Sequence, residues 1–211
     1  MNFIGIDLAG TAKHATGFCI LTTSDFEGDK FAETKILSTD KEIIEETKKA
    51  KPEIIAIDAP LSKGNRKCDY DLKIYGALPL TLKSMEILAE RGIKISGELR
   101  KEKFNVIEVF ATGSAKILGF HNKSREVEQK ELIKVIKGID KRLLKKDEID
   151  AIFCAITAYL YYFGKTTEVG DETGKVIMPS LRSRISEASS EITSFHSEIS
   201  VASPEISKIR I

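Results

Sequence analysis

The chain has 211 residues, of which 42% are hydrophobic and 31% charged, values typical of one folded domain with a substantial core. A formal net charge of +1 argues against steering of the whole molecule toward nucleic acid, so any basic grip must be local. The sequence shows no basic leader and no apolar run of membrane-spanning length, which predicts a cytoplasmic protein without membrane contact. Cys19, Cys68 and Cys154 lack the spacing of a zinc site and lie in or beside apolar segments, so we expect buried free thiols.

The first part of the chain has the pattern of a mixed sheet. Residues 2–8, 15–23 and 30–37 read as three strands in quick succession, which predicts an antiparallel meander. An amphipathic pattern over residues 40–51 predicts a helix. Residues 53–60 read as a continuous apolar strand that ends in Asp58 and is stopped by Pro60, as expected for a parallel strand that is covered on both faces.

The middle of the chain returns to helical spacing. We expect helices over residues 68–77 and 81–91, with Gly92 ending the second of them. Residues 104–110 form another apolar strand, and residues 126–144 predict an amphipathic helix with a basic outer face.

The next segments complete the expected domain, residues 1–179. A helix over residues 147–164 is apolar on nearly every side and should be buried against the sheet. Residues 166–179 read as a hairpin. This order of elements predicts an α/β fold with a five-stranded mixed sheet, in which a three-strand antiparallel meander and two parallel strands are flanked by helices.

Composition shifts over residues 180–211, where serine is frequent. Isoleucine recurs at every seventh position, at Ile185, Ile192, Ile199 and Ile206. Such a heptad suggests a coiled coil, but Ser, Thr and β-branched residues form poor helix, and Pro204 interrupts the last turn. We favour a weakly ordered tail over a helical association element.

Carboxylates stand at informative places in this pattern. Asp7 and Asp58 end two apolar strands, and Glu108 lies in a third. If these strands are parallel neighbours, all three acids approach one edge of the sheet, where ligand sites of such sheets lie. Asp150 falls in the first turn of the buried helix, where the helix dipole favours negative charge, and Asp147 reads better as its N-cap.

These acids would repel one another unless they share protons or hold cations. Two hard ions such as Mg²⁺ would neutralise the cluster through oxygen ligands. A pair of bound metal ions is the usual means by which enzymes hydrolyse a phosphodiester bond.

Five motifs carry a family resemblance: GIDLAG, IAIDAP, the segment Arg66 to Asp69, VIEVF and DEIDAIFCAITAY. Their order and spacing over residues 2–179 resemble the predicted ribonuclease H-like nucleases of the "domain of unknown function 429" family, and the last motif looks like the closing helix of the RuvC Holliday-junction resolvases.

The resemblance implies a ribonuclease H-like fold and a two-metal nuclease that uses Mg²⁺ or Mn²⁺ on DNA or RNA. Asp7, Asp58 and Asp150 match the metal-binding acids, and Glu108 matches a fourth catalytic acid. Ala111 stands where relatives often have proline.

Simpler readings remain open for several residues. Asp7 and Asp58 could serve local turns, and Glu108 could be a solvated edge residue or the partner of a core arginine. Arg66 and Lys67 could contact a substrate phosphate, whereas an Arg66–Asp69 pair that only holds the loop is an equal alternative. His14, after the first strand, is the histidine we would test for an active-site role.

Basic residues are frequent on and around the expected helix over residues 126–144 and could clasp a nucleic-acid backbone. They are Lys123, Arg125, Lys130, Lys134, Lys137, Lys141, Arg142, Lys145 and Lys146. Interleaved acids favour an ordinary solvated face instead.

Two other functions compete with the nuclease. The segment GIDLAGTAKHATG also resembles the first phosphate loop of actin-like ATPases and sugar kinases, but residues 111–114 are a poor second phosphate loop and the chain is too short for two such domains. The third possibility is a ribonuclease H-like binding module without catalysis.

Overall fold

One five-stranded sheet organises the structure, a computed structural model that describes residues 1–180. Its strands are β1 (Asn2–Asp7), β2 (Thr16–Thr22), β3 (Phe31–Leu37), β4 (Ile54–Asp58) and β5 (Val106–Glu108), in the spatial order β3-β2-β1-β4-β5. Strands β1, β2 and β3 pair antiparallel, whereas β4 and β5 run parallel to β1. The predicted combination of a meander with two parallel strands is confirmed. The predictions for the tail beyond residue 180 lie outside the described residues.

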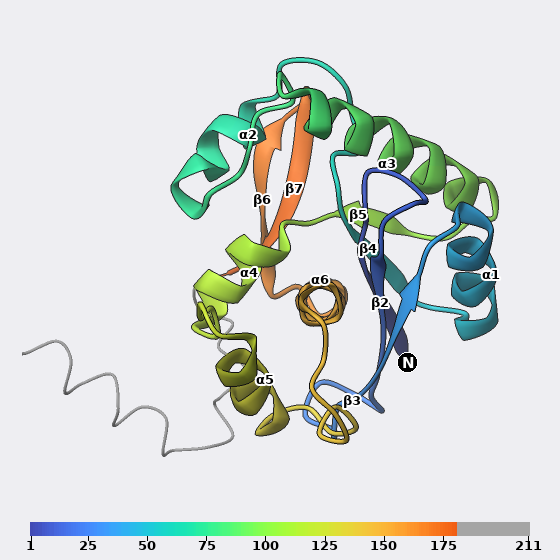
Figure 1. Cartoon of the computed structure of the whole chain (residues 1–211), viewed down its shortest axis with the longest axis vertical. Helices are drawn as coiled ribbons and strands as arrows, with labels where there is room; N and C mark the ends of the chain where they lie inside the picture. Colours follow the sequence, from blue (N-terminus) through green and yellow to red (C-terminus); the bar gives the residue numbers. More distant parts are fainter. Residues whose placement is uncertain (181–211) are drawn as a thin grey trace, which may run out of the picture.

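Helices cover both faces of this sheet (Figure 1). They are α1 (Asp40–Ala50), α2 (Lys67–Asp71), the 3-10 helix η1 (Leu72–Tyr75), α3 (Lys83–Lys101), α4 (Ala111–Leu118), α5 (Arg125–Ile133) and α6 (Lys146–Tyr162). In Figure 1, α6 is seen end-on between the sheet and the pair α4 and α5, while α1 and α3 lie on the opposite face. The predicted hairpin is present as β6 (Thr166–Asp171) and β7 (Gly174–Pro179), and it packs beside α2.

Side-chain alternation along β1 divides the core into two layers. Phe3 belongs to the cluster around α6, whereas Ile4 and Ile6 belong to the cluster with Ile43 of α1 and Ile95 of α3. Successive side chains of a strand point to opposite faces, so odd-numbered residues of β1 face α6.

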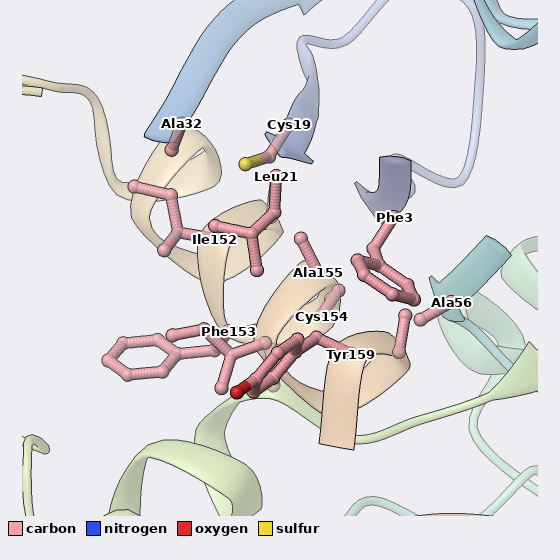
Figure 2. Close-up of a cluster of buried hydrophobic side chains, with 14 of the residues drawn as sticks. Phe3, Cys19, Leu21, Ala32, Ala56, Ile152, Phe153, Cys154, Ala155 and Tyr159 are labelled. Carbon is pink, nitrogen blue, oxygen red and sulfur yellow. The ribbon is translucent and has the colours of Figure 1, made fainter. Parts of the chain in front are cut away.

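Helix α6 is almost entirely buried, as its apolar sequence predicts. Figure 2 shows side chains from the strands gathered around it, among them Phe3, Leu21 and Ala56. Cys19, Cys68 and Cys154 are buried free thiols, which confirms the prediction for the cysteines.

The predicted end of the second middle helix is wrong. Helix α3 continues through Gly92 to Lys101. A Cβ at Gly92 would lie 2.8 Å from the carbonyl oxygen of Pro60, so the glycine permits close packing of the helix on the segment after β4. The glycine therefore marks a close approach of two backbones and leaves the helix unbroken.

The predicted helix over residues 126–144 is also too long. Helix α5 ends at Ile133, and the chain then pairs with the sheet edge: Lys137 donates its N–H to the carbonyl of Lys30 and accepts from Ala32 N. Gly138 follows with φ +91°, a conformation that ends any helix there. Helix α4 was not expected from the sequence.

No helix among residues 1–180 combines the length and the apolar character needed to cross a membrane.

Candidate active site

Asp7 and Asp58 are the last residues of neighbouring parallel strands and stand directly opposite each other in the pairing register. Asp7 is in phase with Phe3, and Asp58 is in phase with Ala56, and both of those residues pack against α6. Both carboxylates are therefore directed to the same face of the sheet, at its carboxyl edge.

The first turns of α6 lie directly on the backbone of β1 and β2. A Cβ at Gly5 would overlap the carbonyl oxygen of Ala151, and one at Gly17 would overlap the carbonyl oxygen of Asp147. Because neither strand carries a side chain at these points, the helix approaches closely enough to bring Asp150 toward Asp7. The two glycines are thus positioning residues for the acid cluster.

Burial and mutual repulsion mark Asp7 and Asp58 as one electrostatic group. Burial, followed by the charges of Asp58 and Asp150, raises the pKa of Asp7 well above its usual range. Burial likewise raises the pKa of Asp58 to about 7, although a 3.1 Å hydrogen bond from Ala111 N opposes the rise. Among residues 1–180, no hydrogen bond or ion pair reaches the Asp7 carboxylate.

Asp150 joins this group but has a cation of its own. Burial raises the pKa of Asp150, while the Lys146 ammonium, 2.8 Å from Asp150 Oδ1, opposes the rise. The Lys146 ammonium also opposes the rise in the pKa of Asp7 and of Asp58, so a single ammonium acts on all three carboxylates.

The carboxylate oxygens of Asp7, Asp58 and Asp150 are the type of ligand that a hard divalent ion prefers. Among the described residues, the Asp7 carboxylate has no hydrogen-bond or ion-pair partner. Within residues 1–180, no group of three His, Cys, Asp or Glu side chains has a ready-made ligand arrangement. The cation that Asp150 contacts is the Lys146 ammonium. The acids therefore fit Mg²⁺ or Mn²⁺ by chemistry, and binding of an ion would draw them closer.

Glu108 is near the cluster but engaged elsewhere. In the register of β4 and β5 it stands opposite Ile57, one position away from Asp58, so the pleat directs it toward the α3 face. Its carboxylate accepts from Leu61 N at 2.7 Å and lies 2.7 Å from Arg66 Nη2. Glu108 is thus the partner of a core arginine, one of the two alternatives weighed for it, and its charge still raises the pKa of Asp58.

Arg66 is only 2% exposed and is saturated by protein acceptors. Its Nε and Nη2 donate to Asp69, and Nη1 donates to Glu108 at 2.9 Å and to Ser62 Oγ at 3.4 Å. In this arrangement, the guanidinium uses its donors to hold the loop, as the Arg66–Asp69 alternative requires. Lys67 is exposed, and its ammonium pairs with Asp71.

A pocket of about 220 Å³ opens beside Asp7, Asp58 and Glu108. Its other wall is apolar and includes Leu72, Leu78, Met85, Leu88, Phe110 and Val176. A larger hollow of about 650 Å³ runs along β3 and contains none of the predicted acids. The smaller pocket is therefore the candidate site.

One other prediction for this region is tested by the start of α6. The prediction that Asp147 is the N-cap is wrong, because the helix begins at Lys146 after the N-cap Lys145. Glu148 serves this turn instead, accepting from Lys145 N at 3.0 Å. His14 is exposed in the turn after β1.

Sequence reasoning named Lys146 only as a possible contact to a nucleic-acid backbone and missed its pairing with Asp150, and it missed Gly5 and Gly17. The spacing of Lys146 and Asp150, four residues apart on a helix, is a signal that could have identified the lysine. Glycines inside apolar strands indicate close approach of another backbone, which could have identified the other two.

No family model and no curated protein matches the chain, so the narrower resemblance to the "domain of unknown function 429" family finds no support. Among solved structures, this chain is similar to T. thermophilus RuvC in complex with a Holliday junction substrate. The TM-score is 0.52 and the sequence identity 11%, and the match covers 78% of this chain and 97% of the RuvC chain. This chain is also similar to a Thermus thermophilus RuvC structure, with a TM-score of 0.51 and a sequence identity of 14%; the match covers 83% of this chain and 99% of that RuvC chain. Together with the mixed sheet and its strand order, these similarities show that the chain has the ribonuclease H-like fold.

Proposed function

We propose that this protein is a divalent-metal-dependent nuclease that hydrolyses phosphodiester bonds of DNA or RNA. The observation that carries the proposal is the placement of Asp7: a carboxylate without a partner among residues 1–180, in register with Asp58 and electrostatically coupled to Asp150. Several partly buried carboxylates that repel one another lower stability, so a function that needs their combined charge accounts for the arrangement. Similarity in fold to RuvC, one of whose structures holds a Holliday junction, supports nucleic acid as the substrate.

Asp7, Asp58 and Asp150 are the residues that would hold Mg²⁺ or Mn²⁺, most simply as two ions. When bound, such ions would supply activation of water and stabilisation of the leaving oxygen. Glu108 acts at the same edge through Arg66 and Leu61 N, which fix the loop that follows Asp58. We assign Glu108 and Arg66 a positioning role in this proposal.

Grip on the nucleic-acid backbone would come from lysines that the protein leaves unpaired. Many basic side chains near α5 have acidic partners, such as Lys134 with Glu131 and Lys137 with Asp29. Within the described residues, no ion pair is formed by Lys13, Lys123, Lys130 or Lys141. A grip from so few lysines predicts a modest dependence of affinity on salt.

The position of residues 111–114 speaks against an actin-like ATPase, which needs a second phosphate loop. Residues 111–114 form the first turn of α4, and Ala111 N donates to the Asp58 carboxylate, so an anion of the protein already occupies this helix start. A Cβ at Gly113 would lie 2.6 Å from Met178 Cε, so this glycine serves packing against the hairpin.

The test is cleavage of a panel of branched, hybrid, duplex and single-stranded nucleic acids with Mg²⁺, with Mn²⁺ and with EDTA. We expect metal-dependent cleavage by the wild type and its loss in Asp7→Asn. Asp140→Asn, which removes an exposed acid that does not line the candidate pocket, serves as the matched control and should cleave normally. Cleavage that survives Asp7→Asn would contradict the mechanism, and ATP turnover without cleavage would favour the ATPase. Metal-independent binding of nucleic acid without cleavage would favour the binding module.

A further inference from the structure

Lys146 lies between two carboxylates that come from different helices. Its Nζ is 2.8 Å from Asp150 Oδ1, one turn further along α6, and 3.2 Å from Glu128 Oε2 on α5. Glu128 is fully buried, and it also accepts from Asn122 N at 3.0 Å. The ammonium therefore has two alternative anionic partners within hydrogen-bonding distance.

Helix electrostatics do not account for a lysine at this place. Lys146 is the first residue of α6, and the start of a helix repels cations. What favours the lysine there is the surrounding negative charge, because its ammonium acts on Asp7 and Asp58 as well as on Asp150. Among the described residues, Lys146 is the cation that pairs with Asp150.

The charge of the site is nevertheless incompletely balanced. One ammonium faces the carboxylates of Asp7, Asp58 and Asp150, and Asp7 has no hydrogen bond or ion pair within the described part of the chain. The pocket of about 220 Å³ is lined by Asp7 and Asp58. One divalent ion at that pair would offset two of the remaining negative charges, whereas an ion at Asp150 must compete with Lys146.

We propose that Lys146 is a resident counter-ion that competes with a divalent cation for Asp150, with Glu128 as the carboxylate that keeps the ammonium when the cation is bound. The inference rests on the proposed function and refines it. The site binds one ion tightly at Asp7 and Asp58 and a second ion more weakly at Asp150. The metal-free protein stays folded because the Lys146 ammonium neutralises Asp150 in place of the second ion.

Metal titration of the full-length chain tests the competition directly. Mn²⁺ binding is measured by calorimetry and by electron paramagnetic resonance for the wild type and for Lys146→Met. We expect the weaker ion to bind about tenfold more tightly in Lys146→Met, because it no longer displaces a charge-assisted hydrogen bond. Lys41→Met removes a lysine from an i,i+4 pair with Glu45 on α1 and should leave both affinities unchanged.

Thermal unfolding separates a counter-ion from a simple tie between two helices. In EDTA, Lys146→Met should unfold at a lower temperature than the wild type, and Mn²⁺ should restore most of the difference. A merely structural lysine would lower the unfolding temperature without recovery by metal and without a change in affinity. That outcome would overturn the proposal.

Glu128→Gln provides a variant with the opposite sign. The amide keeps an acceptor for Asn122 N but removes the second anion, so Lys146 is left with Asp150 alone. We expect the weaker Mn²⁺ ion to bind several-fold less tightly in this variant.

The outcomes also separate this inference from the function on which it rests. If Asp7→Asn abolishes Mn²⁺ binding while Lys146→Met and Glu128→Gln bind as the wild type does, only the competition is overturned. If Asp7→Asn binds Mn²⁺ as the wild type does, the metal centre and the proposed function are overturned together.

Discussion

Strand-end acids of this protein fall into two groups that differ in their partners. Burial raises the pKa of Glu108, but Arg66 and Leu61 N oppose the rise and compensate its charge. Asp7 and Asp58 are partly buried with far less compensation, and burial raises the pKa of each. Under the proposed function, these two acids would be kept at a cost in stability.

Replacing Asp58 with asparagine should stabilise the metal-free protein. The pKa of Asp58 is about 7 in the folded state against about 3.9 in an unfolded chain, so its contribution to stability is present below pH 4 and is lost as pH rises through 7. In EDTA at pH 8, we expect Asp58→Asn to raise the unfolding temperature by several degrees, because about 1 kcal/mol corresponds to about 2–4 °C at this size.

The measurement is calorimetry of Asp58→Asn and wild type at pH 5 and pH 8. Their unfolding temperatures should differ less at pH 5, where the wild-type carboxyl is protonated. Asp140→Asn is the control and should follow the wild type at both values. A wild type that gains stability from pH 5 to pH 8 relative to Asp58→Asn would contradict the assignment.

Replacing Arg66 with methionine should be strongly destabilising, by about 3–5 kcal/mol, because the change leaves buried carboxylates without their cation. Glu108 is 7% exposed and Arg66 2% exposed, so solvent cannot substitute for the lost partner. Urea unfolding measures the loss, and adding Glu108→Gln to Arg66→Met should recover part of it. A loss below about 1 kcal/mol would show that the arginine does not hold the loop.

At the scale of the element, the position of α6 depends on the absence of side chains at two glycines in β1 and β2. Gly5 and Gly17 leave room for the backbone of its first turns, and the same device at Gly92 brings α3 onto the chain after β4. Since Asp150 and Lys146 are both carried by α6, the depth of this helix sets the geometry of the acid cluster.

Gly5→Ala should therefore damage both the fold and the site. The new Cβ would overlap the backbone of α6, and overpacking of this kind costs about 1–3 kcal/mol or more. We expect a lower unfolding temperature and weaker Mn²⁺ binding in the fraction that remains folded. Gly97→Ala on α3 is the matched control: nothing lies within 4 Å of its Cβ, so it should stabilise the protein by about 1 kcal/mol. Equal behaviour of the two variants would contradict the packing argument.

At the scale of the whole molecule, one sheet with helices on both faces brings distant parts of the chain to a single edge. Asp7 and Asp150 are far apart in the sequence, yet β1 and α6 pack directly on each other (Figures 1 and 2). The last strand, β7, contributes Val176, Ile177 and Met178 to the hydrophobic clusters of the described residues.

We expect a chain that ends at Ser180 to unfold cooperatively and within about 2 °C of the full-length protein, because a core of this size can stabilise a domain alone. Calorimetry of both proteins checks this, with Mn²⁺ titration as a second measurement. A shorter chain that fails to fold or to bind the ion would contradict the predicted domain over residues 1–179.

Much of this architecture could be predicted from local patterns. Apolar runs that end in Asp7 and Asp58 predicted the strands and the shared edge, and the apolar sequence after Asp150 predicted a buried helix. Prediction was wrong where the same residue or pattern is compatible with two different structures. Gly92 was expected to end a helix and instead allows close packing, and residues 126–144 kept a helical pattern although the chain leaves the helix to pair with the sheet edge.

The sequence by itself determined the order of the strands, the burial of the last helix and the acids at the strand ends, because hydrophobic periodicity and strand-end charge are local properties. Only the tertiary structure decided which partner each acid meets. A shift of one residue in register separates Glu108 from Asp58 and gives it to Arg66, and glycines in two strands bring Lys146 to the remaining acids. These pairings depend on pleat, register and close packing between segments distant in sequence, and no single segment contains that information.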